Sequence, residues 1–242
     1  MSPLEPAESL EHADTPIGTI YLRRRRIETR PDWVYEIQIS GHLLMSSLHN
    51  VSEKQLSTTA LELHGGAPPL SVLVGGLGLG YTAQAALASP RVARLRVVEK
   101  MDFVIDWMKR GLLPLSEEFA DESRLEISQG DVYAELLAPP TQTYDLILID
   151  VDHAPDDRLV DGPGRFYTPE GQAAVAKHLA PGGVLAVWSY ADNDAFAEVL
   201  KETYPQSCRE AVEWPDEEEP GSGFRNVLFF GGGTPNTKSW SS

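Results

Sequence analysis

The chain has 242 residues, of which 42% are hydrophobic and 23% are charged, as in a folded protein with a sizeable core. Its 36 acidic and 20 basic residues give a formal charge of -16, which opposes binding to nucleic acid or to an anionic membrane. That charge is compatible with a cationic substrate, and it would equally serve solubility alone. The single cysteine, Cys208, excludes an internal disulfide, and the N-terminal residues lack the pattern of a secretory signal. We therefore expect a cytoplasmic protein.

The first part of the chain is predicted to form a small β domain. Short strands begin near residue 15, among them Val34–Ile39, which alternates apolar and polar residues. Ser52–His64 has the pattern of a helix, and the Gly- and Pro-rich segment after it is the expected hinge. We assign residues 15–66 to this N-terminal domain, and we expect the Pro- and Glu-rich residues 1–14 to be disordered.

Four consecutive arginines, Arg23–Arg26, fall within this domain. They could form an anion-binding site, or they could line a sheet edge whose charges face solvent and discourage aggregation. Because an alternating strand points two of the four side chains to each face, the pattern favours the solvated edge.

The rest of the chain alternates strands with helices. Predicted strands cover residues 71–75, 94–98, 124–128, 144–149 and 183–188, and predicted helices cover 81–89, 101–111, 116–121, 131–138, 169–179 and 193–203. Such alternation implies a parallel sheet with helices on both faces. Two apolar runs, 210–214 and 226–230, flank a polar loop and predict a C-terminal antiparallel hairpin. We therefore predict an α/β fold of the Rossmann-like class I methyltransferase type over residues 67–231, with a seven-stranded, mostly parallel sheet, followed by a flexible tail at 232–242.

A glycine-rich turn is the strongest functional signal. The first strand of the main domain ends in Gly76, Gly78 and Gly80, and the next strand ends on Glu99. Glycines let the backbone approach a nucleotide closely, and an acid at the tip of the second strand can accept both ribose hydroxyls. Glu99 could instead cap the helix that starts near Met101, but the spacing favours the ribose.

Two further strand ends carry acids. Gly130, Asp131 and Val132 follow the third strand, where Asp131 could accept a hydrogen bond from an adenine amino group, cap the next helix, or do both. The fourth strand ends in a cluster of acids with one histidine: Asp150, Asp152, His153, Asp156 and Asp157. Asp150 is the first candidate to orient or deprotonate a nucleophile and Asp152 the second, because a carboxylate at this edge faces the expected cleft. Asp156 and Asp157 fit surface charges, and His153 fits a base, a metal ligand or a loop residue.

Together these segments resemble the spermidine synthase (polyamine aminopropyltransferase) family. The matching pieces are the strands before the glycine loop, Val72 to Gly80, Val97 to Glu99, Gly130-Asp131, Tyr144 to Asp150, Phe166 to Glu170 and Leu179 to Leu185. The resemblance implies that the glycines, Glu99, Asp131 and Val132 hold the adenosyl part of a sulfonium donor. It also implies that Asp150 prepares an amine nucleophile, that Tyr167 lines the acceptor pocket, and that the protein is a homodimer.

The chain departs from the family pattern at three places. The family has an Asp in the glycine loop that pairs with the aminopropyl ammonium of decarboxylated S-adenosylmethionine, and Leu79 occupies that position here. The stretch beginning at Ser52 lacks the family's active-site Tyr, and His153 stands where a second Asp is usual. Because a buried ammonium without an acidic partner is costly, Leu79 favours S-adenosylmethionine over its decarboxylated form.

Four functions follow from this pattern. The favoured one is alkylation of an amine by an adenosyl-sulfonium donor without a metal, with methyl transfer slightly ahead of true aminopropyl transfer. A metal-dependent O-methyltransferase is a third possibility, because Asp150-x-Asp152 resembles a metal-binding loop, but Asp192-Asn193 comes late for the rest of the ligand set. The fourth is a nucleoside-binding fold whose catalysis has lapsed.

Overall fold

The computed structural model describes residues 7–27, 30–151, 164–216, 218–219, 221–233 and 240. The N-terminal part is a four-stranded antiparallel sheet with the strands in chain order: β1 Glu8–Thr15, β2 Gly18–Arg26, β3 Trp33–Ile39 and β4 His42–Ser46. Helix α1, Val51–His64, leads from this sheet into the larger domain and ends at Gly65, whose left-handed backbone caps it.

The larger domain is built on a seven-stranded sheet in the order β10-β11-β9-β8-β5-β6-β7. Its strands are β5 Leu70–Gly75, β6 Val92–Glu99, β7 Leu125–Gln129, β8 Tyr144–Ile149, β9 Leu179–Ser189, β10 Gln206–Pro215 and β11 Gly223–Gly232. Strands β5 to β9 pair in parallel, whereas β10 and β11 form the antiparallel hairpin, and this is the predicted fold.

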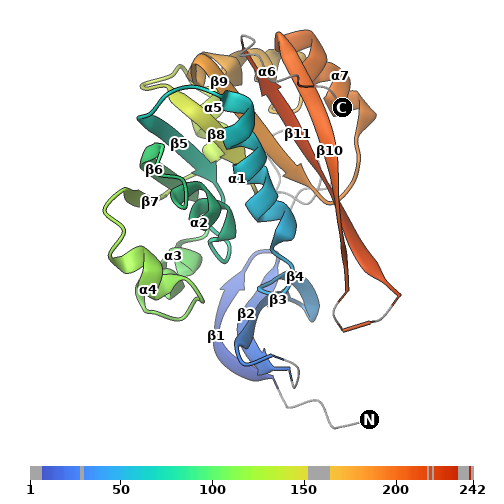
Figure 1. Cartoon of the computed structure of the whole chain (residues 1–242). Coiled ribbons are helices and arrows are strands. Elements are labelled where there is room, and N and C mark those ends of the chain that lie inside the picture. The colour runs from blue at the N-terminus through green and yellow to red at the C-terminus, as the bar shows by residue number, and fades with distance from the viewer. Residues whose placement is uncertain are drawn as a thin grey trace.

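Alternating side chains of these strands build two hydrophobic cores, one on each face of the sheet. The helices are α2 Tyr81–Leu87, α3 Asp102–Lys109, α4 Ser116–Ala120, α5 Val132–Leu137, α6 Pro169–Val175 and α7 Asp194–Thr203. Helices α1 to α4 cover one face, and α5 to α7 cover the other (Figure 1). The carboxyl ends of the parallel strands face the N-terminal sheet (Figure 1).

The expectation that residues 1–14 are disordered is wrong from Glu8 onward. Strand β1 pairs with β2, Leu10 and Ala13 pack against the core, and Glu8 forms an ion pair with Arg24. The sequence hid this strand because its apolar residues are few. The predicted tail lies mostly outside the described residues, but β11 extends to Gly232 and Trp240 packs against the core.

The arginine run is not a solvated sheet edge, because β2 is an inner strand paired on both sides. Arg24 and Arg26 lie over the ring of Trp33. Arg25 is partly buried and pairs with Glu36 and, through two hydrogen bonds of 2.7 and 2.6 Å, with Glu218 near the tip of the β10–β11 hairpin. The run therefore joins the N-terminal sheet to the far end of the chain.

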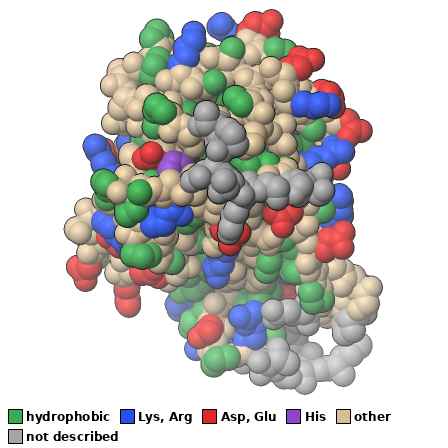
Figure 2. Space-filling model, turned by 45° about the horizontal axis from the view of Figure 1, so that its top comes forward, with side chains coloured by type: hydrophobic (Ala, Val, Ile, Leu, Met, Phe, Trp, Pro, Cys, Tyr) green, Lys and Arg blue, Asp and Glu red, His purple; other side chains and the backbone are tan. Residues whose placement is uncertain are grey.

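Acidic and basic side chains are interspersed on the face drawn in Figure 2, without a continuous basic patch. Within the described ranges, no helix is long and apolar enough to cross a membrane.

Candidate active site

The glycine loop between β5 and α2 is packed against the end of β8. Gly76, Gly78 and Gly80 all have positive φ, at 93°, 50° and 96°. A Cβ atom on Gly76 would overlap the carbonyl oxygen of Asp150, and one on Gly80 would lie 2.8 Å from the ring of Phe119. Glycine is therefore required here both by the turn and by the close approach of two backbones.

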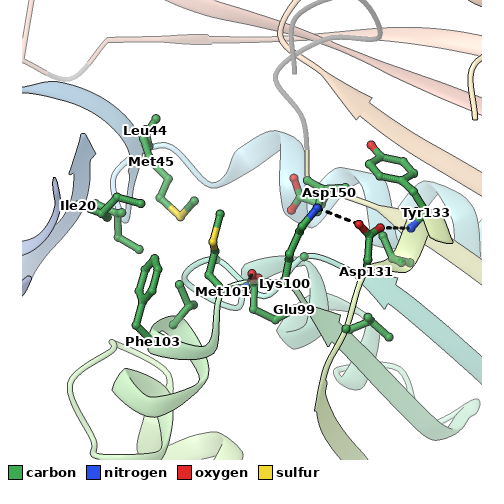
Figure 3. A pocket seen from close by; sticks show the side chains of 18 of the residues that line it. Ile20, Leu44, Met45, Glu99, Lys100, Met101, Phe103, Asp131, Tyr133 and Asp150 are labelled. Atoms are coloured by element: carbon green, nitrogen blue, oxygen red, sulfur yellow. Dashed lines mark hydrogen bonds and ion pairs between the residues drawn. The ribbon is translucent and has the colours of Figure 1, made fainter. Parts of the chain in front are cut away.

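A first cavity lies between the N-terminal sheet and the carboxyl edge of the large sheet (Figure 3). Apolar side chains form one wall, among them Ile20, Leu44, Met45, Met101 and Phe103. The predicted donor-binding residues form the other, since the cavity is lined by Gly76, Gly78, Glu99, Asp131, Val132 and Asp150. Of the predicted set only Gly80 lies elsewhere, and it lines a second cavity next to the first.

Glu99 is 7% exposed and both its carboxylate oxygens are held by backbone N–H groups. Oε2 accepts from Leu77 in the glycine loop at 2.8 Å, and Oε1 accepts from Met101 at 2.7 Å. Burial raises the pKa of Glu99, and the backbone donors oppose that shift. The backbone N–H groups of Gly78 and Lys100 also lower the pKa of Glu99, so the residue ties the loop to the start of α3.

Asp131 is the N-cap of α5. Its Oδ1 accepts from the backbone N–H groups of Tyr133 and Ala134, and its Oδ2 pairs with Lys100 Nζ at 2.8 Å (Figure 3). Partial burial raises the pKa of Asp131, but Lys100 and the backbone donors outweigh it, so the net pKa is lowered. The capping role is therefore present, and the carboxylate is ionised at the cavity wall.

Asp150 lies where the two cavities meet. It lines both of them, together with Leu44, Met45, Gly78 and Val151. Its Oδ2 accepts a 2.6 Å hydrogen bond from Thr82 in the first turn of α2. Burial raises the pKa of Asp150; the Thr82 hydrogen bond opposes the shift and the nearby charge of Glu99 adds to it.

A second acid, Glu53 on α1, lies in the second cavity beside Asp150. Although the residue keeps some exposed surface, its carboxylate is largely surrounded by protein, and this burial and the charge of Asp150 raise its pKa. Ser52 donates to it at 2.7 Å, and Trp188 in turn donates to Ser52 at 2.9 Å. Sequence reasoning missed Glu53, because only its helical position was apparent and not the packing of α1 over the strand ends.

The remainder of the second cavity is largely apolar and aromatic. Its wall includes Leu77 and Leu79 of the glycine loop, Tyr81, Trp188 and, from the hairpin, Trp214 and Phe224. Leu79 is 4% exposed and belongs to the hydrophobic core, so no acid stands at this position of the loop.

Comparison with known proteins reveals both sequence and structural relatives. The chain is 32% identical over 124 residues to polyamine aminopropyltransferase 2 of Streptomyces coelicolor, which covers 50% of this chain and 22% of that protein. It is also 32% identical over 117 residues to putrescine N-methyltransferase 2 of Nicotiana tabacum, which covers 48% of this chain and 31% of that protein. The crystal structure of spermidine synthase from Thermotoga maritima matches 93% of this chain and 72% of that chain, with a TM-score of 0.69 and 17% identity.

The chain has a spermidine synthase-like fold. No family model matches it. The chain spans between a fifth and a third of the length of these two curated relatives, one named for aminopropyl transfer and one for N-methyl transfer. The structural match shows that the two-sheet architecture is shared.

Five residues singled out in the sequence lie outside the two cavities or outside the described residues. Tyr167 lines neither cavity; its hydroxyl is 2.9 Å from that of Tyr133, which lines the first. Asp152 and His153 lie outside the described residues, as do Asp156 and Asp157. Their roles stay predictions.

The other half of the predicted metal-binding pattern is already engaged. Asp192 pairs with Arg209 at 2.7 Å, and the side chain of Asn193 caps α7. Within the described part of the chain, no three His, Cys, Asp or Glu residues are grouped as metal ligands.

The close approach of Gly76 to Asp150 predicts an unequal cost for two alanine substitutions. Gly111 has a φ of 78° and open space around it, so Gly111→Ala should cost only the ~1–2 kcal/mol of the backbone conformation. Gly76→Ala should cost about 1–3 kcal/mol more, because a Cβ would also overlap Asp150. Urea unfolding of both variants measures the difference, and equal losses would show that the contact is unimportant.

The raised pKa of Glu53 predicts that the protein loses stability as the pH rises. Between the ordinary glutamate pKa of about 4.3 and its raised folded-state pKa, the folded protein holds a proton that the unfolded chain releases. Glu53→Gln should therefore melt higher than the natural protein at pH 8, with a smaller gap at pH 5. Glu62→Gln, on the exposed part of the same helix, is the matched control and should show no such trend. A pH-independent effect of Glu53→Gln would count against the pKa assignment.

Proposed function

We propose that this protein transfers an alkyl group, most readily methyl, from an S-adenosyl sulfonium donor to an amine. The observation that carries the proposal is that two cavities meet at one carboxylate, Asp150. The first cavity is lined by acids and glycines at the carboxyl ends of parallel strands, where nucleosides bind in such folds. The two relatives, one an aminopropyltransferase and one an N-methyltransferase, support the same class of reaction.

The first cavity is suited to the adenosyl group. Glu99 is fixed by backbone donors at the tip of β6, where an acid can accept hydrogen bonds from ribose hydroxyls. The lowered pKa of Asp131 keeps its carboxylate ionised, so it can accept a hydrogen bond from the amino group of adenine. Met101 and Val132 line the apolar part of the cavity wall. When bound, the donor supplies an alkyl carbon that its positively charged sulfur already activates. The protein then has to hold the amine and this carbon in line and to accept a proton from the amine.

The second cavity is suited to a cationic amine. Asp150 and Glu53 line the same cavity; burial and the charge of Asp150 raise the pKa of Glu53, and burial and the charge of Glu99 raise that of Asp150. An incoming ammonium group offsets the repulsion between these carboxylates. The ammonium first gives one proton to a carboxylate, which frees the lone pair of its nitrogen. That nitrogen then bonds to the alkyl carbon while the carbon–sulfur bond breaks and its electron pair stays on sulfur, and the product leaves as an alkylammonium. Asp150, at the junction, is the proposed acceptor of that proton.

Methyl transfer is favoured over aminopropyl transfer by Leu79. An aminopropyl donor carries an ammonium group, and the loop side chain expected to pair with it is a buried leucine here. Aminopropyl transfer is the second candidate, because polyamine aminopropyltransferase 2 is among the relatives. Cys208, a lone half-buried thiol, suits a reducing compartment, so we place the reaction in the cytoplasm.

Incubation with putrescine and each donor in turn tests the group transferred. We expect N-methylputrescine or another methylated amine from S-adenosylmethionine and little product from its decarboxylated form. Spermidine formed from the decarboxylated donor would replace methyl transfer by aminopropyl transfer. Failure to bind either donor or methylthioadenosine in calorimetry would favour a lapsed enzyme, and loss of activity with a chelator would favour a metal-dependent one.

Asp150→Asn tests the proposed proton acceptor. The amide keeps the shape of the side chain but cannot take a proton, so kcat should fall by about 10²–10⁴-fold while the Kd for S-adenosylmethionine changes little. In the natural protein, activity should fall as the pH drops through the raised pKa of Asp150, because its carboxylate becomes protonated. Asp121→Asn, at an exposed helix end, is the control. Unchanged kcat in Asp150→Asn would remove this residue from the mechanism.

A further inference from the structure

The second cavity extends from the acid pair along one face of the hairpin. Trp188, which donates to Ser52 beside Glu53, pairs across the sheet with Leu228 of β11. Asn226 and Phe224 follow on the same face, each two residues and therefore about 7 Å further toward the hairpin tip. Both line the cavity, and Trp214 stands opposite Phe224 on β10. A small molecule could therefore reach from the carboxylates at one end of the cavity to Phe224 and Trp214 at the other.

The far end is aromatic. The rings of Trp214 and Phe224 are stacked with centroids 5.6 Å apart and planes at 22°, and the ring of His49 lies 4.0 Å from that of Phe224. Leu43 of β4 also lines the second cavity. Among the described residues that line the second cavity, Glu53 and Asp150 are the only carboxylates, and both lie at the end where the cavities meet.

Two polar groups at the far end lack partners among the described residues. The indole Nε1 of Trp214 is buried without a hydrogen-bond partner. The side chain of Asn226, in a residue only 9% exposed, makes no hydrogen bond within the described part of the chain. An indole N–H can only donate, so it calls for an oxygen or another acceptor on the molecule that fills the cavity. Buried polar groups in native proteins are normally satisfied, so the buried Nε1 of Trp214 indicates a ligand, and the amide of Asn226 lines the same cavity.

Resting on the proposed amine alkylation, we propose that the acceptor is a monoamine with a flat, apolar body and a neutral oxygen at its far end, and not a linear diamine. Its ammonium group meets Asp150 and Glu53, its body lies against Trp188, Phe224 and Trp214, and its oxygen accepts from Trp214 or Asn226. An aryl-alkylamine with a ring hydroxyl has this chemistry.

A diamine fits this cavity poorly. Its second ammonium group would be desolvated where Trp214 offers a donor and where no carboxylate belongs to the described cavity lining; Asp216 and Glu218 interact with His49 from outside that lining. The face of an aromatic ring attracts a cation, but Trp214 and Phe224 each have one face covered by the other ring. The attraction of a cation to a ring face also offsets only part of the free energy that burial of the charge costs. The amide oxygen of Asn226 is a neutral acceptor and offsets less than a carboxylate would.

Calorimetry of the full chain with tyramine, phenethylamine and putrescine tests the inference. We expect tyramine to bind at least about tenfold more tightly than putrescine, and phenethylamine to lie between them. Trp214→Phe keeps the ring and removes the N–H, so it should weaken tyramine and leave phenethylamine unchanged. Asn226→Asp places a carboxylate at the far end and should shift the preference toward putrescine by about tenfold.

Asn193→Asp is the matched control, because it adds the same charge at the cap of α7, where Asp caps as well as Asn, and lies outside the cavity. It should leave the ranking of the three amines unchanged. Equal or tighter binding of putrescine to the natural chain, absence of amine binding, or an equal shift in both Asp variants would overturn the inference.

Titration with S-adenosylmethionine separates this inference from the proposed function. A chain that binds S-adenosylmethionine and prefers putrescine overturns only the acceptor class. A chain that ranks the amines as expected but binds neither adenosyl donor overturns the proposed transfer and supports the pocket assignment.

Discussion

The site depends on the contact between two backbones at Gly76 and Asp150. Because no side chain fits between them, the glycine loop lies directly on the end of β8. Helix α2 starts from that loop, and its Thr82 holds the Asp150 carboxylate at 2.6 Å. Glu99 then binds the loop from the other side through Leu77. Loop, helix and two acids thus form one rigid unit, and the junction of the cavities follows from its shape.

The outer walls of both cavities come from the two ends of the chain. Met45, near the end of β4, lines both cavities, and Trp214 and Phe224 extend the second one along the hairpin. Arg25 holds these ends together through its two hydrogen bonds to Glu218. This partly buried arginine with two acidic partners fixes geometry better than an exposed pair would. The N-terminal sheet and the hairpin therefore belong to the site as much as the strand ends do.

The sequence was sufficient to predict the alternating sheet and the first cavity. Parallel strands bring their carboxyl ends to one edge, so Glu99, Asp131 and Asp150 could be placed together from their positions alone. The strand β1 was missed because its stability comes from pairing with β2, and Glu53 because its burial comes from the packing of α1. The hairpin strands were predicted but not the wall they form, because the contact of their tip with the N-terminal sheet through Arg25 and Glu218 joins residues far apart in the sequence.

The pair of acids Glu53 and Asp150 makes amine binding depend on the pH of the solution. Burial and the charge of Asp150 raise the pKa of Glu53, which favours its protonated form near neutral pH. An arriving ammonium favours the charged form of both, so the site exchanges a proton for a cation. Under the proposed function, binding of the amine then releases a proton, so it lowers the pH of an unbuffered solution. The affinity for the amine increases as the pH rises. The protein would take up amine most readily in an alkaline environment, before any chemistry takes place.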